Sequence, residues 1–288
     1  MRLAITHTTH YRFAQPVVHA IQRLRLTPKS TQGQEIVAWD MTFANAARQF
    51  EYEDQHRNLT TLIAMEPGTK EMTVTCAGIV DTHDHAGVIG RHAGHLPLWS
   101  FRGQTPLTKP GAGMRGLVRD LRKEGLGTLD MLHQLSTRIR EKVEYQTGVT
   151  GVETSAEDAW ALGCGVCQDH AHLFIGSARA LGVPARYVSG YLMMNDRVDQ
   201  DATHAWAEAH VEDLGWVGFD VSNRISPDPR YVRVATGRDY RDAAPITGIS
   251  TGSVAEALTV AVAVEQQPVP SQSQNQNQSQ SQSQGQQQ

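Results

Sequence analysis

Cysteine is scarce in this sequence: the chain of 288 residues contains Cys76, Cys164 and Cys167 and no other. So few thiols, and an odd number of them, exclude a disulfide framework and fit a reducing compartment, which predicts a cytoplasmic protein. Long apolar runs are also lacking, so we expect neither a secretory signal nor a membrane-spanning helix. An excess of one charge is missing too. The net charge of −4 argues against nucleic acid and membrane surfaces as partners.

Strand-like alternation dominates the first part of the chain. Leu3, Ile5 and His7 alternate with polar residues, as they do in a strand with one buried face. An antiparallel β domain is therefore predicted over residues 1–103. Within residues 82–113 the sequence becomes rich in His, Gly and Pro without a clear period, which predicts a domain junction.

Helical and strand-like patterns mix in the second part, which predicts an α+β domain over residues 104–265. Two helices are expected within residues 113–144, and a third over residues 167–181. Strand-like runs follow at 185–194, 204–211, 216–221 and 257–264. The Gln- and Ser-rich tail, residues 266–288, carries almost no apolar side chain, so we expect it to be disordered.

The stretch GCGVCQDHAH, residues 163–172, places two cysteines and two histidines within ten positions. A zinc site would use four of its side chains: Cys164, Cys167, His170 and His172. All four lie on one short segment, and a helix starting near Cys167 turns His172 to a different face from His170, which disfavours zinc. In a C-x-x-C redox site, the strand of a βαβ unit normally precedes the helix that carries the cysteines. A Gly- and Thr-rich turn stands there instead.

A nucleophile needs a thiol at a helix N-terminus, a histidine from elsewhere and an acceptor that orients the histidine. Cys167 begins the predicted helix, whose dipole and unpaired N–H groups stabilise a thiolate. A hairpin centred near Glu212 would place His204 directly opposite Asp220, on one face of two neighbouring strands. A slip of one residue would separate them. His210 is the competing base, but His204 lies at the strand end, where a substrate can enter.

Three stretches carry a family resemblance: GVCQDHAHLFIGSARALGVPARYVSGYL, then THAWAEAH, then GWVGFD. They resemble the transglutaminase-like superfamily, which is papain-like in its catalytic logic. MRLAITHTTHYRF, RLRLTP and WDMTF resemble the β domain that precedes the core in bacterial members. The resemblance implies a Cys-bearing helix packed on an antiparallel sheet, with Cys167 as nucleophile, His204 as base and Asp220 as its orienter. The sequence departs from the family at Cys164, which is not usually required, and at His170, where an aromatic residue is common.

The expected function is acyl transfer through a thioester, from a carboxamide or peptide bond of a protein or peptide to an amine or water. One alternative is a cysteine protease or amidase that only hydrolyses. Another is a non-catalytic peptide-binding module, and a third is a dithiol protein that uses Cys164 and Cys167. We expect the backbone N–H of Cys167 to stabilise the oxyanion, with Gln168 or Trp160 as candidate side chains.

No metal or organic cofactor is expected for this chemistry. Two groups of side chains could suggest metal, but they lack the fixed spacing of ligands and are expected to lie in surface loops. The first group is His83, His85, His92 and His95, and the second is Asp196, Asp199 and Asp201.

Overall fold

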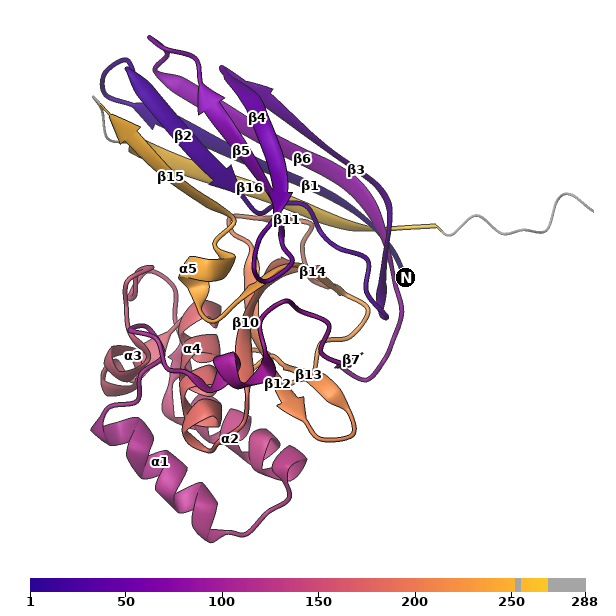
Figure 1. The fold of residues 1–288 in the computed structure, drawn as a ribbon, viewed down its shortest axis with the longest axis vertical. Helices are drawn as coiled ribbons and strands as arrows, with labels where there is room; N and C mark the ends of the chain where they lie inside the picture. Colours follow the sequence, from indigo (N-terminus) through magenta and orange to yellow (C-terminus); the bar gives the residue numbers. More distant parts are fainter. Residues whose placement is uncertain (252–254, 269–288) are drawn as a thin grey trace, which may run out of the picture.

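A computed structural model describes residues 1–251 and 255–268, in which a β-sandwich lies against a core of helices and a further sheet (Figure 1). Both sheets of the sandwich are antiparallel. Their strand orders are β11–β16–β1–β6–β3 and β15–β2–β5–β4. The strands are β1 (Arg2–Phe13), β2 (His19–Leu24), β3 (Gln34–Ala44), β4 (Ala46–Glu53), β5 (Leu59–Met65), β6 (Glu71–Thr82), β11 (Asp199–Gln200), β15 (Ile246–Thr251) and β16 (Ala255–Gln267).

The alternation seen in the sequence explains how the sandwich forms. Leu3, Ile5 and His7 on β1 are buried, whereas the residues between them are less so, as predicted for a strand with one covered face. Apolar side chains from both sheets fill the space between them: Phe13, Leu24, Met41, Ile63, Met65, Met72, Val74 and Cys76. The predicted antiparallel β domain is therefore confirmed, as two packed sheets.

The chain returns to this sandwich at its end. β15 pairs with β2, and β16 pairs with β1 over its length, from Arg2 opposite Gln267 to Phe13 opposite Ala255. The strand predicted at 257–264 is confirmed, but it lies in a sandwich sheet and not beside the core strands that share the predicted range 104–265. Gln266 and Gln267 belong to β16, and residues 269–288 of the predicted tail lie outside the described residues.

The core combines helices with a sheet of the order β14–β10–β12–β13–β7. Its strands are β7 (Val88–Gly90), β10 (Ala185–Leu192), β12 (His204–Val211), β13 (Gly215–Phe219) and β14 (Tyr231–Gly237). Its helices are η1 (Leu98–Arg102), α1 (Ala112–Lys123), α2 (Thr128–Lys142), α3 (Ala156–Leu162), α4 (Cys167–Ala180) and α5 (Tyr240–Ala243). A short parallel pair, β8 (Glu144–Tyr145) and β9 (Cys164–Gly165), precedes α4. The predicted α+β class is confirmed.

Small residues set the packing of α4 on the sheet. Ala205, Ala207 and Ala209 on β12 face the helix, and they share one apolar cluster with Ala171 and Phe174 of α4. Their short side chains let helix and strand approach closely. The close neighbour of this small-residue face is the helix that carries Cys167.

Two parts of the core differ from what the sequence predicts. α3 forms within a stretch expected to be turns, because Ser155 caps it by accepting a hydrogen bond from Asp158 N, and Gly163 ends it at φ +77°. The predicted junction, 82–113, contributes β7 to the core sheet. No helix within 1–251 and 255–268 is both long and apolar enough to span a membrane.

The sandwich and the core share an apolar interface. Side chains of β1, β6 and β16 meet those of β10 and β14: Leu3, Ile5, Val80, Tyr191, Val232, Val234, Val262 and Val264. β10 is consequently buried along its whole length, between α4 on one face and the sandwich on the other. The core sheet is thus held rigidly, and so are the residues at its strand ends.

Candidate active site

Cys167 is the first residue of α4, and its surroundings fix the start of that helix. Asp169 Oδ2 accepts a hydrogen bond from Val166 N at 2.8 Å and another from Thr150 Oγ1 at 2.6 Å. Gly165 leaves room for this carboxylate, because a Cβ there would lie 2.7 Å from Asp169 Oδ2. The half-buried thiol therefore sits at the positive end of the helix dipole, which favours a negative sulfur.

His204 and Asp220 meet across the core sheet. His204 Nε2 lies 2.6 Å from Asp220 Oδ2, and both side chains are buried. The predicted register was wrong by two residues: Ala207 pairs with Phe219, so the ladder would place Asp220 opposite Trp206 and diagonal to His204. An even shift keeps both side chains on one face, and this is why the pair still forms.

The Asp220 carboxylate is held by more donors than the sequence revealed. Asn223 Nδ2 donates to Oδ2 at 2.7 Å, Asn223 N donates to Oδ1 at 3.2 Å, and Tyr231 OH donates to Oδ2 at 2.7 Å. Burial opposes ionisation of Asp220, but the bonds from His204, Asn223 and Tyr231 outweigh it and lower the pKa of this carboxyl. Asp220 is therefore a buried anion with several fixed donors.

His204 is poised to remain an imidazolium. Burial lowers the pKa of its ring, whereas hydrogen bonds and charge interactions with Asp220 and Cys167 raise it, with a net result of about 10. Because Nε2 serves Asp220, Nδ1 is the ring nitrogen left for the thiol. Trp206 stacks on the ring with a centroid separation of 6.1 Å, and Tyr231 tilts against it at 5.9 Å. The structure therefore places the imidazole of His204 between the thiol of Cys167 and the carboxylate of Asp220.

The zinc interpretation gains no support from the surroundings of the motif. His170 Nε2 bonds to Val143 O and its Nδ1 to Ser222 Oγ, while His172 Nε2 accepts from Tyr240 N. Burial lowers the pKa of His170 to about 4 and that of His172 to about 3, so both are neutral structural side chains. Across residues 1–251 and 255–268, no three His, Cys, Asp or Glu side chains are placed to hold a metal ion. Cys164 and Cys167 are both free thiols.

Three other candidate side chains have contacts of their own in the structure. His210 lies six residues along β12 from His204, about 20 Å away in an extended strand, with its ring against Trp216. Gln168 donates its amide to Val152 O at 3.3 Å. The Trp160 indole nitrogen lies against α1, since a Cβ on Gly113 would approach it to 2.2 Å. His210 is therefore too far from Asp220 to replace His204 as the base, while Gln168 and Trp160 remain predictions for the oxyanion.

Tyr145, at the end of β8, is a site residue that the sequence did not reveal. Its side chain is 42% exposed. Tyr145 pairs with Gly165 in the β8–β9 ladder, two residues before Cys167. Burial raises the pKa of its hydroxyl, and the charges of Cys167 and Asp220 add to that effect. Asn223 and Tyr231 were missed as well, because they act through Asp220 from a loop and from β14. The sequence indicated Tyr145 only through its position, directly before the Gly- and Thr-rich turn that precedes the stretch GCGVCQDHAH.

Sequence comparison with known families places the chain. A model of the transglutaminase-like superfamily matches residues 115–221, which span the thiol, the imidazole and the carboxylate, and a model of the bacterial transglutaminase-like N-terminal region matches residues 3–81. The chain belongs to the transglutaminase-like superfamily. The match over 3–81 covers the larger part of the sandwich, and the match over 115–221 lies in the core. The chain thus combines the N-terminal region of bacterial members with the superfamily core, as its sequence predicts.

Relatives of similar length match most of this chain. The uncharacterized protein ML0607 of Mycobacterium leprae is 29% identical over 278 residues, which cover 90% of this chain and 96% of that protein. The uncharacterized protein Rv2569c of Mycobacterium tuberculosis is 30% identical, over 86% of this chain and 87% of that protein. The crystal structure of a candidate cysteine protease from Cytophaga hutchinsonii superimposes with a TM-score of 0.70 at 22% identity, covering 93% of both chains. That likeness confirms the fold.

Proposed function

We propose that this transglutaminase-like protein is a cysteine enzyme that cleaves a carboxamide or peptide bond through a thioester and passes the acyl group to an amine or to water. Cys167 is the nucleophile, His204 the proton carrier and Asp220 the group that orients and charges the imidazole. The observation that carries the proposal is the 2.6 Å bond between His204 Nε2 and Asp220 Oδ2, on an imidazole that also bonds the side chain of Cys167.

The first half of the reaction forms the thioester. The Cys167 sulfur attacks the carbonyl carbon, a C–S bond forms, and the carbonyl electron pair moves to oxygen. The backbone N–H of Cys167, in the first turn of α4, would stabilise that oxyanion. When the adduct collapses, the C–N bond breaks, and His204 gives its proton to the departing nitrogen. The acyl group remains on sulfur, and His204 is neutral.

The second half releases the acyl group. An amine or a water molecule gives a proton to neutral His204 as it attacks the thioester carbon, and the C–S bond breaks to restore the thiolate. Asp220 stabilises the imidazolium that forms again. Tyr145, exposed beside Cys167 and Asp220, stands where the acceptor and the acyl chain would arrive. Hydrolysis alone, as in a cysteine protease or amidase, uses the same groups with water as the acceptor.

The test combines a glutamine-containing protein substrate, such as casein, with a biotinylated primary amine. The wild-type chain is expected to incorporate biotin, release ammonia, or cut the substrate, and mass spectrometry identifies which of these occurs. Cys167→Ala should lose all three, because no sulfur remains to carry the acyl group. Cys164→Ala is the matched control and should keep them. Turnover retained by Cys167→Ala would refute the assignment, and loss of function in both Cys164→Ala and Cys167→Ala would favour the dithiol alternative, which needs both sulfurs.

A cytoplasmic location is part of the same proposal. Free thiols at Cys76, Cys164 and Cys167 fit a reducing compartment. Cell fractionation of the native host with an antibody against the chain would test it, and recovery in an extracytoplasmic fraction would contradict it.

A further inference from the structure

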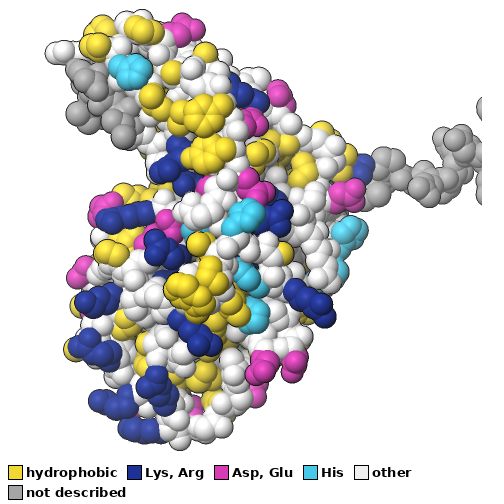
Figure 2. Space-filling model, viewed as in Figure 1, with side chains coloured by type: hydrophobic (Ala, Val, Ile, Leu, Met, Phe, Trp, Pro, Cys, Tyr) yellow, Lys and Arg dark blue, Asp and Glu magenta, His cyan; other side chains and the backbone are white. Residues whose placement is uncertain are grey.

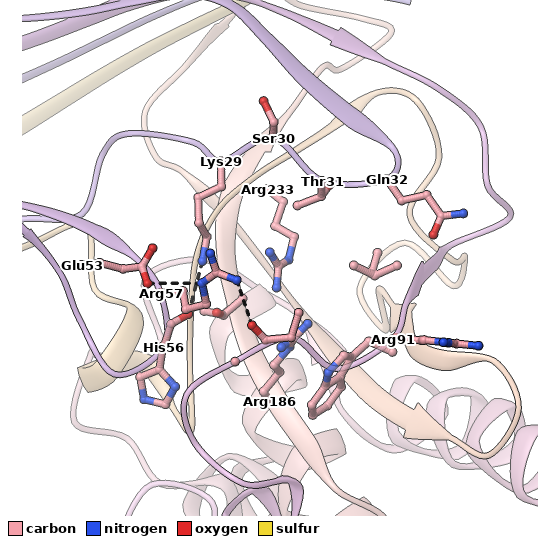
Figure 3. Close-up of a pocket in the computed structure, with 15 residues that line it drawn as sticks. Lys29, Ser30, Thr31, Gln32, Glu53, His56, Arg57, Arg91, Arg186 and Arg233 are labelled. Atoms are coloured by element: carbon pink, nitrogen blue, oxygen red, sulfur yellow. Dashed lines mark hydrogen bonds and ion pairs between the residues drawn. The ribbon is translucent and has the colours of Figure 1, made fainter.

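A cavity of about 460 Å³ lies where loops of the sandwich meet strands of the core sheet (Figure 3). Its wall is built by both parts. The loop before β3 contributes Lys29, the loop after β4 contributes Arg57, and the core strands β10 and β14 contribute Arg186 and Arg233. Figure 2 shows basic and histidine side chains on the surface at this junction. The volume suits a small-molecule ligand.

Positive side chains converge in this cavity. Figure 3 shows Lys29, Arg57, Arg186 and Arg233 extending towards the same space. Glu208 is fully buried beneath it and bonds Arg186 Nε at 2.6 Å and Arg233 Nε at 2.7 Å. At the rim, Arg57 Nε bonds Glu53 Oε1 at 3.2 Å. Basic side chains therefore outnumber the carboxylates of Glu53 and Glu208 at this cavity.

The other nearby carboxylates do not supply the missing negative charge. Asp54 is bound to the buried Arg25, with Arg25 Nε 2.9 Å from Asp54 Oδ2. Asp242 is bound to His56 and Arg238, each at 3.1 Å. Both anions are therefore already matched by cations of their own. The excess belongs to the cavity, in a chain whose overall charge is negative.

Lys29 has no carboxylate partner for its positive charge among the described residues. Its ammonium makes only long bonds, to His56 O at 3.3 Å and Asn58 Oδ1 at 3.4 Å, and no carboxylate within the described part of the chain forms an ion pair with it. Burial, followed by the charges of Arg233 and Arg186, lowers the pKa of Lys29 to about 7. A buried cation without a counter-charge is costly, so an anion in the cavity would stabilise the charged form.

The geometry of Arg186 and Arg233 fits oxyanion recognition. Glu208 anchors both guanidinium groups, and the Arg186 guanidinium also lies over the Trp216 ring at 3.9 Å. Guanidinium groups fixed in this way present N–H donors at low entropic cost to carboxylate or phosphate oxygens. We propose that this cavity binds a small ligand with two or more negative charges, carried on phosphate or carboxylate groups. The proposal does not depend on the chemistry of Cys167.

Isothermal titration calorimetry tests the site with the full chain at low ionic strength and two probes, inorganic pyrophosphate and citrate. Saturable 1:1 binding of either probe is expected, and the tighter probe shows whether the natural group is phosphate or carboxylate. Lys29→Gln and Arg57→Gln should each weaken binding about tenfold, because each removes one of the converging charges. Lys70→Gln, which changes an exposed lysine in the turn between β5 and β6, is the matched control and should bind as the wild type does.

Two results would overturn the proposal. One is the absence of saturable binding with both probes. The other is equal affinity in the wild type, Lys29→Gln and Arg57→Gln, since binding would then occur elsewhere. Circular dichroism checks the fold of each variant. If Lys29→Gln does not fold, Arg57→Gln decides the question, because the Arg57 side chain is 48% exposed and its replacement leaves the core intact.

Discussion

At the scale of single residues, Asp220 does more than hold His204 in place. Its carboxylate receives bonds from His204, Asn223 and Tyr231 and stays ionised although it is buried. A buried anion beside the ring stabilises the imidazolium, and this effect accounts for much of the raised pKa of His204. Orientation and charge can be separated by a substitution that keeps the shape of the side chain and removes its charge.

Asp220→Asn is expected to lower kcat by roughly 10² to 10⁴-fold, because the imidazolium loses its counter-charge. The pH profile carries the sharper signal. In the wild type His204 stays protonated up to about pH 10, so activity that depends on the imidazolium is lost only as pH rises through that value. In the variant the pKa of His204 falls, and the alkaline limb moves to lower pH. Steady-state rates between pH 6 and 11 measure both effects.

Asp228→Asn provides the control for that experiment. Asp228 is another carboxylate of the same loop region, and it pairs with Arg230 at 2.6 Å away from the imidazole of His204. The alkaline limb of the pH profile of Asp228→Asn should coincide with that of the wild type. An unchanged alkaline limb in Asp220→Asn would show that Asp220 does not charge the imidazole.

The pairing of His204 with Asp220 shows which features of the site could be predicted from the sequence. Period-two alternation on two strands was sufficient to put both residues on one face, although the register was wrong by two. Asn223 and Tyr231 could not be predicted, because their contacts with Asp220 depend on the path of the chain after β13. Local patterns encode which face a residue occupies, whereas tertiary structure decides what meets it there.

At the scale of elements, the position of Cys167 depends on how closely α4 packs against its neighbours. Gly176, in the middle of the helix, faces the backbone of the segment before α1, and a Cβ there would lie 1.9 Å from Thr108 O. Arg179 of the same helix bonds Thr108 Oγ1 at 3.1 Å. The helix is therefore held against a backbone carbonyl that cannot rotate away, as a flexible side chain would.

Gly176→Ala is expected to destabilise the protein by about 1–3 kcal/mol, because helix and loop must separate to admit the methyl group. Gly116→Ala is the matched control. Gly116 lies within α1 and has no atom within 4 Å of the added Cβ, so this change should stabilise the protein by about 0.5–1 kcal/mol. Urea denaturation of both variants measures the free energy of unfolding. Equal and small effects would mean that α4 can shift freely.

Elements with strong local signals could be predicted, and those defined by distant partners could not. The helix over 167–181 and the strand over 204–211 agree with α4 and β12 almost to the residue. α3 is short, and its cap at Ser155 was the only mark of it. The strand at 257–264 was recognised as a strand, but its partner β1 lies at the other end of the sequence, and no local pattern identifies that pairing.

At the scale of the whole molecule, buried histidines join its parts. His7 of β1 bonds Tyr191 of β10 at 2.8 Å, across the interface between sandwich and core. His170 links α4 to Val143 O and Ser222, and His172 links it to Tyr240 N. Burial lowers the pKa of His7 and of His170 to about 4, and that of His172 to about 3. All three are therefore neutral in the folded protein at pH 7 and remain so at pH 5.

Acid should consequently destabilise the protein between pH 7 and pH 5, above the range in which most carboxylates titrate. Between pH 7 and pH 5 the unfolded chain takes up protons on these histidines near pH 6.5 and the folded chain does not, so each costs about 2 kcal/mol of stability over that interval. His204 has a raised pKa and acts in the opposite direction by roughly 1 kcal/mol, because its folded form is already protonated at pH 7. We expect a net loss of about 4–5 kcal/mol, measured by urea denaturation at pH 7, 6 and 5.

His7→Gln should remove about 2 kcal/mol of that pH dependence, whereas His19→Gln, at an exposed histidine of β2, should leave it unchanged. If His7→Gln and the wild type lose the same stability on acidification, the neutral His7 at the interface is not a source of the acid sensitivity.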